Sequence, residues 1–370
     1  MTGVHGQVLG HVVRRSVEAV QNQNDDMQTF LSQHQLPTWA VVSLVLYCLV
    51  FAILLASIRY TIGDVIATLM MVETPKTETV IFTESKESSD PDAPLEKAPL
   101  LDAEAITVKH EAVTRTARST MCHMVKKAGF FSRWRGLSVS FVYHLCVGIL
   151  LSFVPPRSPL LQGSVSIIAT VLFSRLHMTW THVLISEPST KGWWRRIPSA
   201  KAGHNVLLPS AIYATAQQLT IYMPVLLALV LGVHNVDHSQ LVHSFDKAER
   251  VTYGLKLFAC AVTGLFVAVM ILLPAAVTLT RVEASMLPEE DEAIVPFDRT
   301  FGGKAESTVT DRSGSISFVE AWRSCDKIVR FRIVKVYAQL ITMQVVIMIL
   351  GITGAVVFIS GYAVAKNSPN

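Results

Sequence analysis

Six stretches of the chain combine many apolar residues with almost no charged ones. They are residues 38–58, 136–154, 160–185, 206–233, 257–280 and 336–365. A helix of roughly 20 residues crosses the roughly 30 Å of bilayer hydrocarbon, and its backbone hydrogen bonds are satisfied internally there. The pattern therefore predicts an all-α fold: a polytopic integral membrane helical bundle with about six transmembrane helices.

The polar segments between these stretches are the predicted tails and connections. They are the N-terminal tail 1–37, a largely disordered linker at 59–135, the connections 155–159, 186–205, 234–256 and 281–335, and the C-terminal tail 366–370. The linker is rich in Glu, Ser, Asp, Pro and Lys around residues 84–94, a composition typical of disorder.

Arg175 interrupts the third stretch. A charged side chain at the bilayer centre costs about 2.5–3.5 kcal/mol on insertion scales. A re-entrant segment is the alternative to a full span here, and it would reverse the topology of everything that follows.

The composition agrees with a membrane protein, and the placement of the charges orients it. Only 16% of residues are charged and 51% are hydrophobic, which argues against a soluble enzyme or a disordered chain. The net charge of +4 is too small and too spread out to favour nucleic-acid binding. Segments 59–135, 186–205 and 281–335 contain 24 of the 32 Lys and Arg residues, against 7 in the remaining tails and connections. The positive-inside rule then places these three segments in the cytoplasm and both termini on the non-cytoplasmic side.

Polar residues inside the apolar stretches are the candidate functional residues, because such groups are costly in lipid. They are His144, Arg175, His177, His182, Gln217 and Gln218. One interpretation is structural: Arg175 and the histidines of its stretch reach the interface, and the glutamines join helices. The other is a polar solute path near the second to fourth stretches.

Small residues in the last stretch, Gly351, Gly354 and Gly361 among them, predict close helix packing. No Ser-His-Asp set, His-Glu-x-x-His or Cys-x-x-Cys pattern occurs, so the sequence predicts no catalytic residue, no bound metal and no cofactor. The two cysteines in polar segments, Cys122 and Cys325, are expected to be free thiols, with palmitoylation as the alternative.

The linker contains a short sorting pattern. Glu96 stands four residues before the pair Leu100 and Leu101, as in the acidic dileucine signal that clathrin adaptors bind in extended form. The alternative is a chance match. As a signal, it predicts an endosomal or vacuolar membrane, with the plasma membrane as the alternative location.

Two segments have features of the membrane interface. Residues 318–335 form a basic amphipathic pattern that either lies on anionic lipid or packs against neighbouring helices. Trp193, Trp194, Arg195 and Arg196 have the amphipathic aromatic and cationic side chains of interface anchors.

Three sequences resemble a family of uncharacterised multi-pass membrane proteins of filamentous fungi. They are residues 180–189 (WTHVLISEPS), 193–196 (WWRR) and 284–303 (ASMLPEEDEAIVPFDRTFGG). The resemblance extends over roughly residues 136–365 and implies a fungal membrane protein. Some members are labelled ubiquitin carriers, but no His-Pro-Asn sequence supports that label here. The resemblance implies no activity. Because the predicted cytoplasmic connections contain more recognisable signals than the apolar stretches, we predict a non-enzymatic membrane organising or trafficking component, with a small-solute or ion transporter as the alternative.

Overall fold

The computed structural model describes residues 37–74, 77–81, 105–109, 112–155, 158–233, 246–301 and 316–367. Within them, five helices are long and apolar enough to cross a membrane, and the number is six if the bent pair Pro159–Leu172 and Ser174–Ile185 forms one span. This confirms the predicted all-α fold with about six such helices. The dileucine residues Glu96, Leu100 and Leu101 lie outside the described residues.

The elements follow one another as long helices with short helical and strand segments between them. In chain order they are α2 (Thr38–Ile58), η1 (Arg59–Ile66), α3 (Ala67–Val72), β1 (Thr77–Ile81), β2 (Ala105–Lys109), α4 (Ala117–Ala128), η2 (Phe130–Trp134), α5 (Leu137–Ser152), α6 (Pro159–Leu172), α7 (Ser174–Ile185), η3 (Trp193–Arg196), α8 (Ala200–Val230), α10 (Lys247–Val267), η5 (Ala268–Leu272), α11 (Leu273–Ser285), α12 (Phe318–Arg323) and α13 (Lys327–Asn367).

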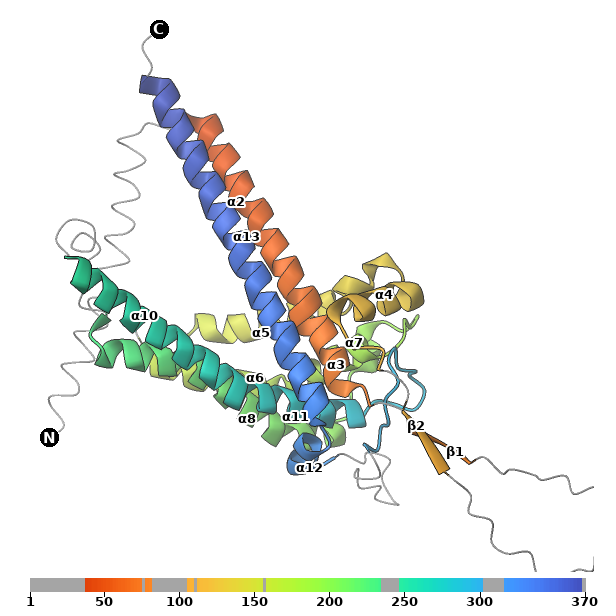
Figure 1. The fold of residues 1–370 in the computed structure, drawn as a ribbon. Coiled ribbons are helices and arrows are strands. Elements are labelled where there is room, and N and C mark those ends of the chain that lie inside the picture. Colours follow the sequence, from red (N-terminus) through yellow and green to blue (C-terminus); the bar gives the residue numbers. More distant parts are fainter. Residues whose placement is uncertain are drawn as a thin grey trace, which may run out of the picture.

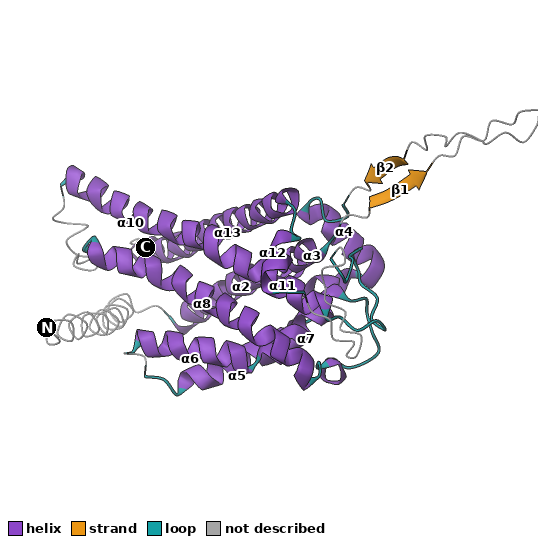
Figure 2. Cartoon of the chain, turned by 90° about the horizontal axis from the view of Figure 1, so that it is seen from below, coloured by secondary structure: helices purple, strands orange, loops and turns teal. Residues whose placement is uncertain are grey.

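The long helices diverge from one compact end of the molecule (Figure 1). We call this end the head; its buried residues come from η1, α3, α4, α7 and α11 and from the segments beside them. Helices α2 and α13 leave the head as one pair, and α5, α6, α8 and α10 leave it as a second group. The view from below shows β1 and β2 extending from the same end (Figure 2). The two helix groups expose most of their apolar side chains, as expected for helices surrounded by lipid.

The head has a hydrophobic core of its own, drawn from segments far apart in the sequence. Its members include Leu69 of α3, Met124 of α4, Ile185 of α7 and Val282 of α11, all fully or almost fully buried. The predicted connections 59–135 and 281–335 both contribute buried members, and Trp193 of the connection 186–205 packs against them, so the three connections are parts of one folded unit.

The ends of the predicted linker 59–135 are ordered, which differs from the expectation. The first helix does not stop at Ile58 but continues through a π-helical segment, η1, to Val72. Residues 60–72 are mostly apolar and buried in the head, so the segment folds as part of its core. Strands β1 and β2 pair antiparallel, with Thr77 opposite Lys109, and α4 and η2 follow.

The third apolar stretch is broken at the position of its charge. Helices α6 and α7 meet at Phe173 and are bent by 61°. Arg175 therefore lies in the first turn of α7, where its Nη2 donates a hydrogen bond to the carbonyl oxygen of Pro198 at 2.6 Å. The bend allows the guanidinium to reach a polar partner in the following connection.

The amphipathic segment 318–335 is two helices rather than one, because residues 324–326 separate α12 from α13. Cys325, Val329 and Ile333 are buried against η1, α3 and α11. This face of the segment therefore packs against neighbouring helices, while Val319, Ile328 and Phe331 are exposed, so contact of the segment with anionic lipid stays a prediction.

Candidate functional site

A carboxylate buried in the head connects α11 to α7. Glu283 has no exposed surface. His177 Nδ1 donates a hydrogen bond to its Oε1 at 2.7 Å, and Thr181 Oγ1 donates to its Oε2 at 2.5 Å. His182 Nε2 donates a hydrogen bond to the backbone carbonyl oxygen of Glu283 at 2.8 Å. Two of the predicted polar residues, His177 and His182, are therefore brought together on one partner.

A small polar cavity adjoins this carboxylate. It has a volume of about 60 Å³, and its polar lining comes from several elements, namely Asp64 (η1), His177 and Thr181 (α7), Tyr213 (α8), Thr280 (α11) and Tyr337 (α13). A water molecule needs about 30 Å³, so the space fits one or two waters rather than an organic solute. The carboxyl and imidazole groups on its wall can bind and release protons.

Sequence reasoning missed Asp64, Arg281 and Glu283, which all lie just beyond the ends of the predicted spans. Arg281 is almost fully buried, and its Nε donates to the carbonyl oxygen of Met71 at 2.8 Å. One signal was available for Asp64: it is the only charged residue within the mostly apolar run 60–72. A lone acid in such a run indicates a buried functional or structural role.

Four residues predicted to line a solute path, His144, Arg175, Gln217 and Gln218, do not line this cavity. His144 lies on the exposed side of α5, next to the rings of Tyr143 and Trp180. Gln218 Nε2 donates to Ser166 Oγ at 3.1 Å and so joins α8 to α6. Gln217 is half-buried on α8. Neither glutamine nor His144 lines the cavity, and Arg175 is engaged with Pro198.

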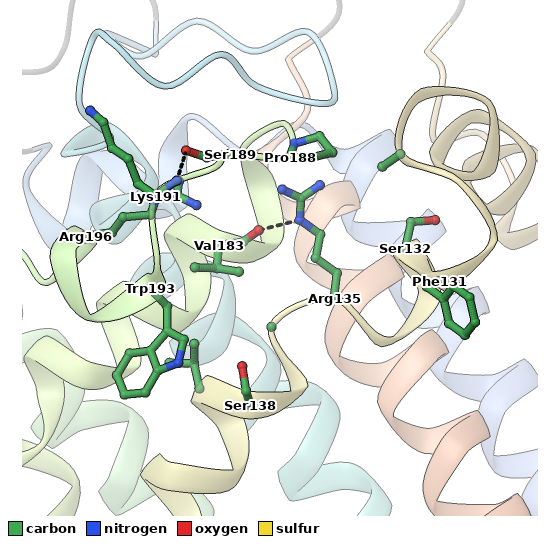
Figure 3. Close-up of a pocket in the computed structure, with 13 residues that line it drawn as sticks. Phe131, Ser132, Arg135, Ser138, Val183, Pro188, Ser189, Lys191, Trp193 and Arg196 are labelled. Atoms are coloured by element: carbon green, nitrogen blue, oxygen red, sulfur yellow. Dashed lines mark hydrogen bonds between the residues drawn. The ribbon is translucent and has the colours of Figure 1, made fainter.

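A second, larger pocket opens on the surface of the head where α5 begins (Figure 3). Its volume is about 310 Å³. Three basic residues line it: Arg135 before α5, and Lys191 and Arg196 in the connection after α7. Of the predicted interface anchors, Trp193 and Arg196 line this pocket, whereas Trp194 and Arg195 are exposed beside it.

The basic side chains of this pocket are held by few partners. Arg135 Nε donates to the carbonyl oxygen of Val183 at 2.6 Å (Figure 3). Arg196 Nη2 pairs with Asp291 at 3.0 Å, and Lys191 pairs with Glu290 at 2.9 Å. Three buried donor atoms around the pocket have no hydrogen-bond partner in the described part of the chain. They are Ser132 Oγ, Arg135 Nη1 and Arg196 Nε.

The two cysteines of the head differ in access. Cys325 is buried, and burial raises the pKa of its thiol above the ordinary value. Because acylation and oxidation require an accessible thiolate, Cys325 is a poor target for modification. Cys122 is exposed on α4. Over the described residues, no group of three His, Cys, Asp or Glu side chains is arranged to hold a metal ion.

Comparison with known proteins adds no further assignment, because no family model, no curated protein and no solved structure matches the chain.

Proposed function

We propose that the chain is a non-enzymatic component that organises a membrane or directs its traffic. The supporting observation is the head: three connections between membrane helices form one folded unit with its own core, whereas the helix groups leave their apolar surfaces to lipid. A folded platform at one membrane surface suits the binding of partners there. Membership of the fungal multi-pass family named above remains a prediction.

The platform also presents the predicted sorting signal. Residues 82–104, which contain Glu96, Leu100 and Leu101, connect β1 to β2, and these strands pair with each other. Both ends of the connection therefore join the strand pair that extends from the head (Figure 2). With the head in the cytoplasm, as the basic residues predict, the signal faces clathrin adaptors.

Imaging of a fluorescently tagged chain tests this function. We expect the wild type on endosomal or vacuolar membranes and the Leu100→Ala, Leu101→Ala double variant at the plasma membrane. Glu96→Ala should shift the protein in the same direction, whereas Glu84→Ala, a matched loss of an acid in the same connection, should not. An unchanged location of the double variant would contradict the adaptor role.

The cavity beside Glu283 favours a second function, transport of an ion or small solute. Its size suits a proton, a water or a small inorganic ion rather than an organic solute. Its walls come from η1, α7, α8, α11 and α13, of which α7 and α8 belong to the predicted third and fourth spans. Proton flux into proteoliposomes containing the whole chain tests it. Flux that Asp64→Asn abolishes and Glu290→Gln leaves intact would favour transport, and absence of flux would exclude protons as the cargo.

A further inference from the structure

We propose that the pocket formed by Arg135, Lys191 and Arg196 binds a phosphate-bearing anion, supplied by the headgroup of an anionic lipid. Binding of such a lipid does not require that the chain organises its membrane. The lining of the pocket contains three cationic side chains and no carboxylate. Its volume of about 310 Å³ is at the lower end of the range of small-molecule sites, about 300–1,000 Å³.

The neighbouring carboxylates leave part of this positive charge available. Glu290 and Asp291 pair with Lys191 and Arg196 from outside the lining. By contrast, the Arg135 guanidinium donates a hydrogen bond to a neutral carbonyl group, that of Val183, and the nearby carboxylate of Glu187 is paired with Lys127 at 2.6 Å. Arginine presents its donors in a planar fork that matches phosphate oxygens. Arg135 is therefore the principal phosphate-binding residue of the proposed site.

Donors without partners point to the same ligand. Ser132 is only 4% exposed, and its Oγ has no hydrogen-bond partner among the described residues, as is true of Arg135 Nη1. An unsatisfied buried polar group costs about 1–3 kcal/mol. An anion with several acceptor oxygens in the pocket would accept hydrogen bonds from both groups.

The start of α5 adds a further favourable field. The helix begins at Leu137 after Gly136, which provides no side-chain cap, and Ser138 and Val139 line the pocket. The first N–H groups of a helix have no partner within the helix, and its dipole places partial positive charge at this end. An anion bound here completes the hydrogen bonding of α5.

The surroundings of the pocket favour a lipid as the source of the phosphate. An apolar stripe on α5 leads away from the pocket, and its members Leu137, Phe141, Leu145 and Ile149 are all exposed at intervals of four residues. Phe131 lines the pocket and is exposed, and the exposed Trp194 follows the pocket residue Trp193. The amphipathic ring of tryptophan favours the headgroup level. A lipid bound with its phosphate in the pocket thus has its acyl chains along α5.

The test measures binding of soluble short-chain lipids to the full chain purified in detergent. The probes are dioctanoyl phosphatidic acid, dioctanoyl phosphatidylcholine and inorganic phosphate. We expect phosphatidic acid to bind at least about tenfold more tightly than phosphatidylcholine, because charge-assisted hydrogen bonds are the stronger kind. Arg135→Gln should weaken this binding about tenfold, the loss expected for one such bond.

Two further variants keep the test decisive if Arg135→Gln fails to fold. Lys191→Gln removes an exposed cation of the lining and should weaken binding about threefold, because its ion pair with Glu290 is also solvent-exposed. Arg195→Gln removes the same charge from an exposed residue outside the lining and should leave binding unchanged.

The outcomes separate the sources of the anion. Tight binding of phosphatidic acid with weak binding of inorganic phosphate supports the lipid headgroup. Equal binding of both, with the same dependence on Lys191, supports a phosphate site but assigns it to a soluble ligand. Equal binding of the two lipids, or equal losses for Lys191→Gln and Arg195→Gln, would overturn the proposal, since the attraction would then be a property of the surface as a whole.

Discussion

Single buried polar residues hold the head together at the points where its helices meet. Glu283 accepts hydrogen bonds from His177 and Thr181, and through its backbone from His182, so one residue of α11 fixes three of α7. Arg281 lies two residues earlier on the same helix. Its guanidinium donates hydrogen bonds to the carbonyl oxygen of Met71 in α3 and to the hydroxyl of Ser324, which follows α12. Because buried polar groups are costly without partners, each of these contacts selects one relative placement of the helices.

Replacement of the buried carboxylate should destabilise the head. Glu283→Gln removes the charge that accepts two hydrogen bonds, and we expect a loss of about 3–5 kcal/mol in the free energy of unfolding, as for other disrupted buried pairs. The measurement is the thermal-unfolding midpoint of the purified protein in detergent. Glu290→Gln is the matched control, because Glu290 is exposed and its pair with Lys191 contributes little. Equal midpoints for the two variants would contradict this account of Glu283.

The sequence identified only part of this polar network. His177 and His182 were found because an ionisable residue inside an apolar stretch is conspicuous. Glu283 and Arg281 follow the fifth stretch, where a charge ordinarily marks the start of a solvated connection. Only the packing of α3, α7 and α12 around α11 makes that position an interior one, and hydropathy along the chain contains no information about such contacts.

At the scale of the elements, close packing of small residues joins α2 to α13. A Cβ added at Gly351 would lie 2.9 Å from the ring of Phe51, and one added at Gly354 would overlap the hydroxyl of Tyr47. That hydroxyl donates to the carbonyl oxygen of Gly351 at 3.2 Å. The predicted packing role of these glycines therefore has a defined partner helix, with van der Waals contact and one interhelical hydrogen bond.

A larger side chain at Gly354 should separate this helix pair. We expect Gly354→Leu to cost about 1–3 kcal/mol through overpacking against Tyr47. Gly361→Leu makes the same change farther along α13, where a Cβ meets no atom within 4 Å, and should be neutral. Thermal midpoints of both variants in detergent measure the difference. A Gly354→Leu protein as stable as Gly361→Leu would show that the contact is not tight.

The centres of the helices were predictable, but their ends were not. A charge-free run of about 20 residues is a strong signal, and each of the six runs is helical in the structure. The ends extend further: α8 begins at Ala200 rather than 206, and α13 begins at Lys327 rather than 336. These extra turns enter the head, where protein rather than lipid covers their apolar residues, so that charges can lie alongside them.

At the scale of the whole molecule, α2 and α13 leave the head side by side. The first residues of α2 and the last residues of α13 lie together, since the rings of Trp39 and Tyr362 are 6.0 Å apart. Both are far from the head, as Figure 1 shows. We therefore predict that, where both helices cross the bilayer, the start of α2 and the end of α13 lie on the side opposite the head. The distribution of basic residues then predicts which side is cytoplasmic.

Epitope accessibility tests this arrangement and its orientation together. Tags are placed at each terminus and within residues 82–104, and protease is applied to cells whose plasma membrane alone has been permeabilised. We expect the linker tag to be cleaved and both terminal tags to be protected, because 24 of the 32 basic residues lie in the head-side segments. Labelling of the exposed Cys122 by an impermeant maleimide, with Cys122→Ser as control, provides an untagged check. Cleavage of both termini with a protected linker would reverse the orientation inferred from charge. Cleavage of one terminus alone would contradict the packing of α2 against α13, and with it the arrangement of the whole bundle.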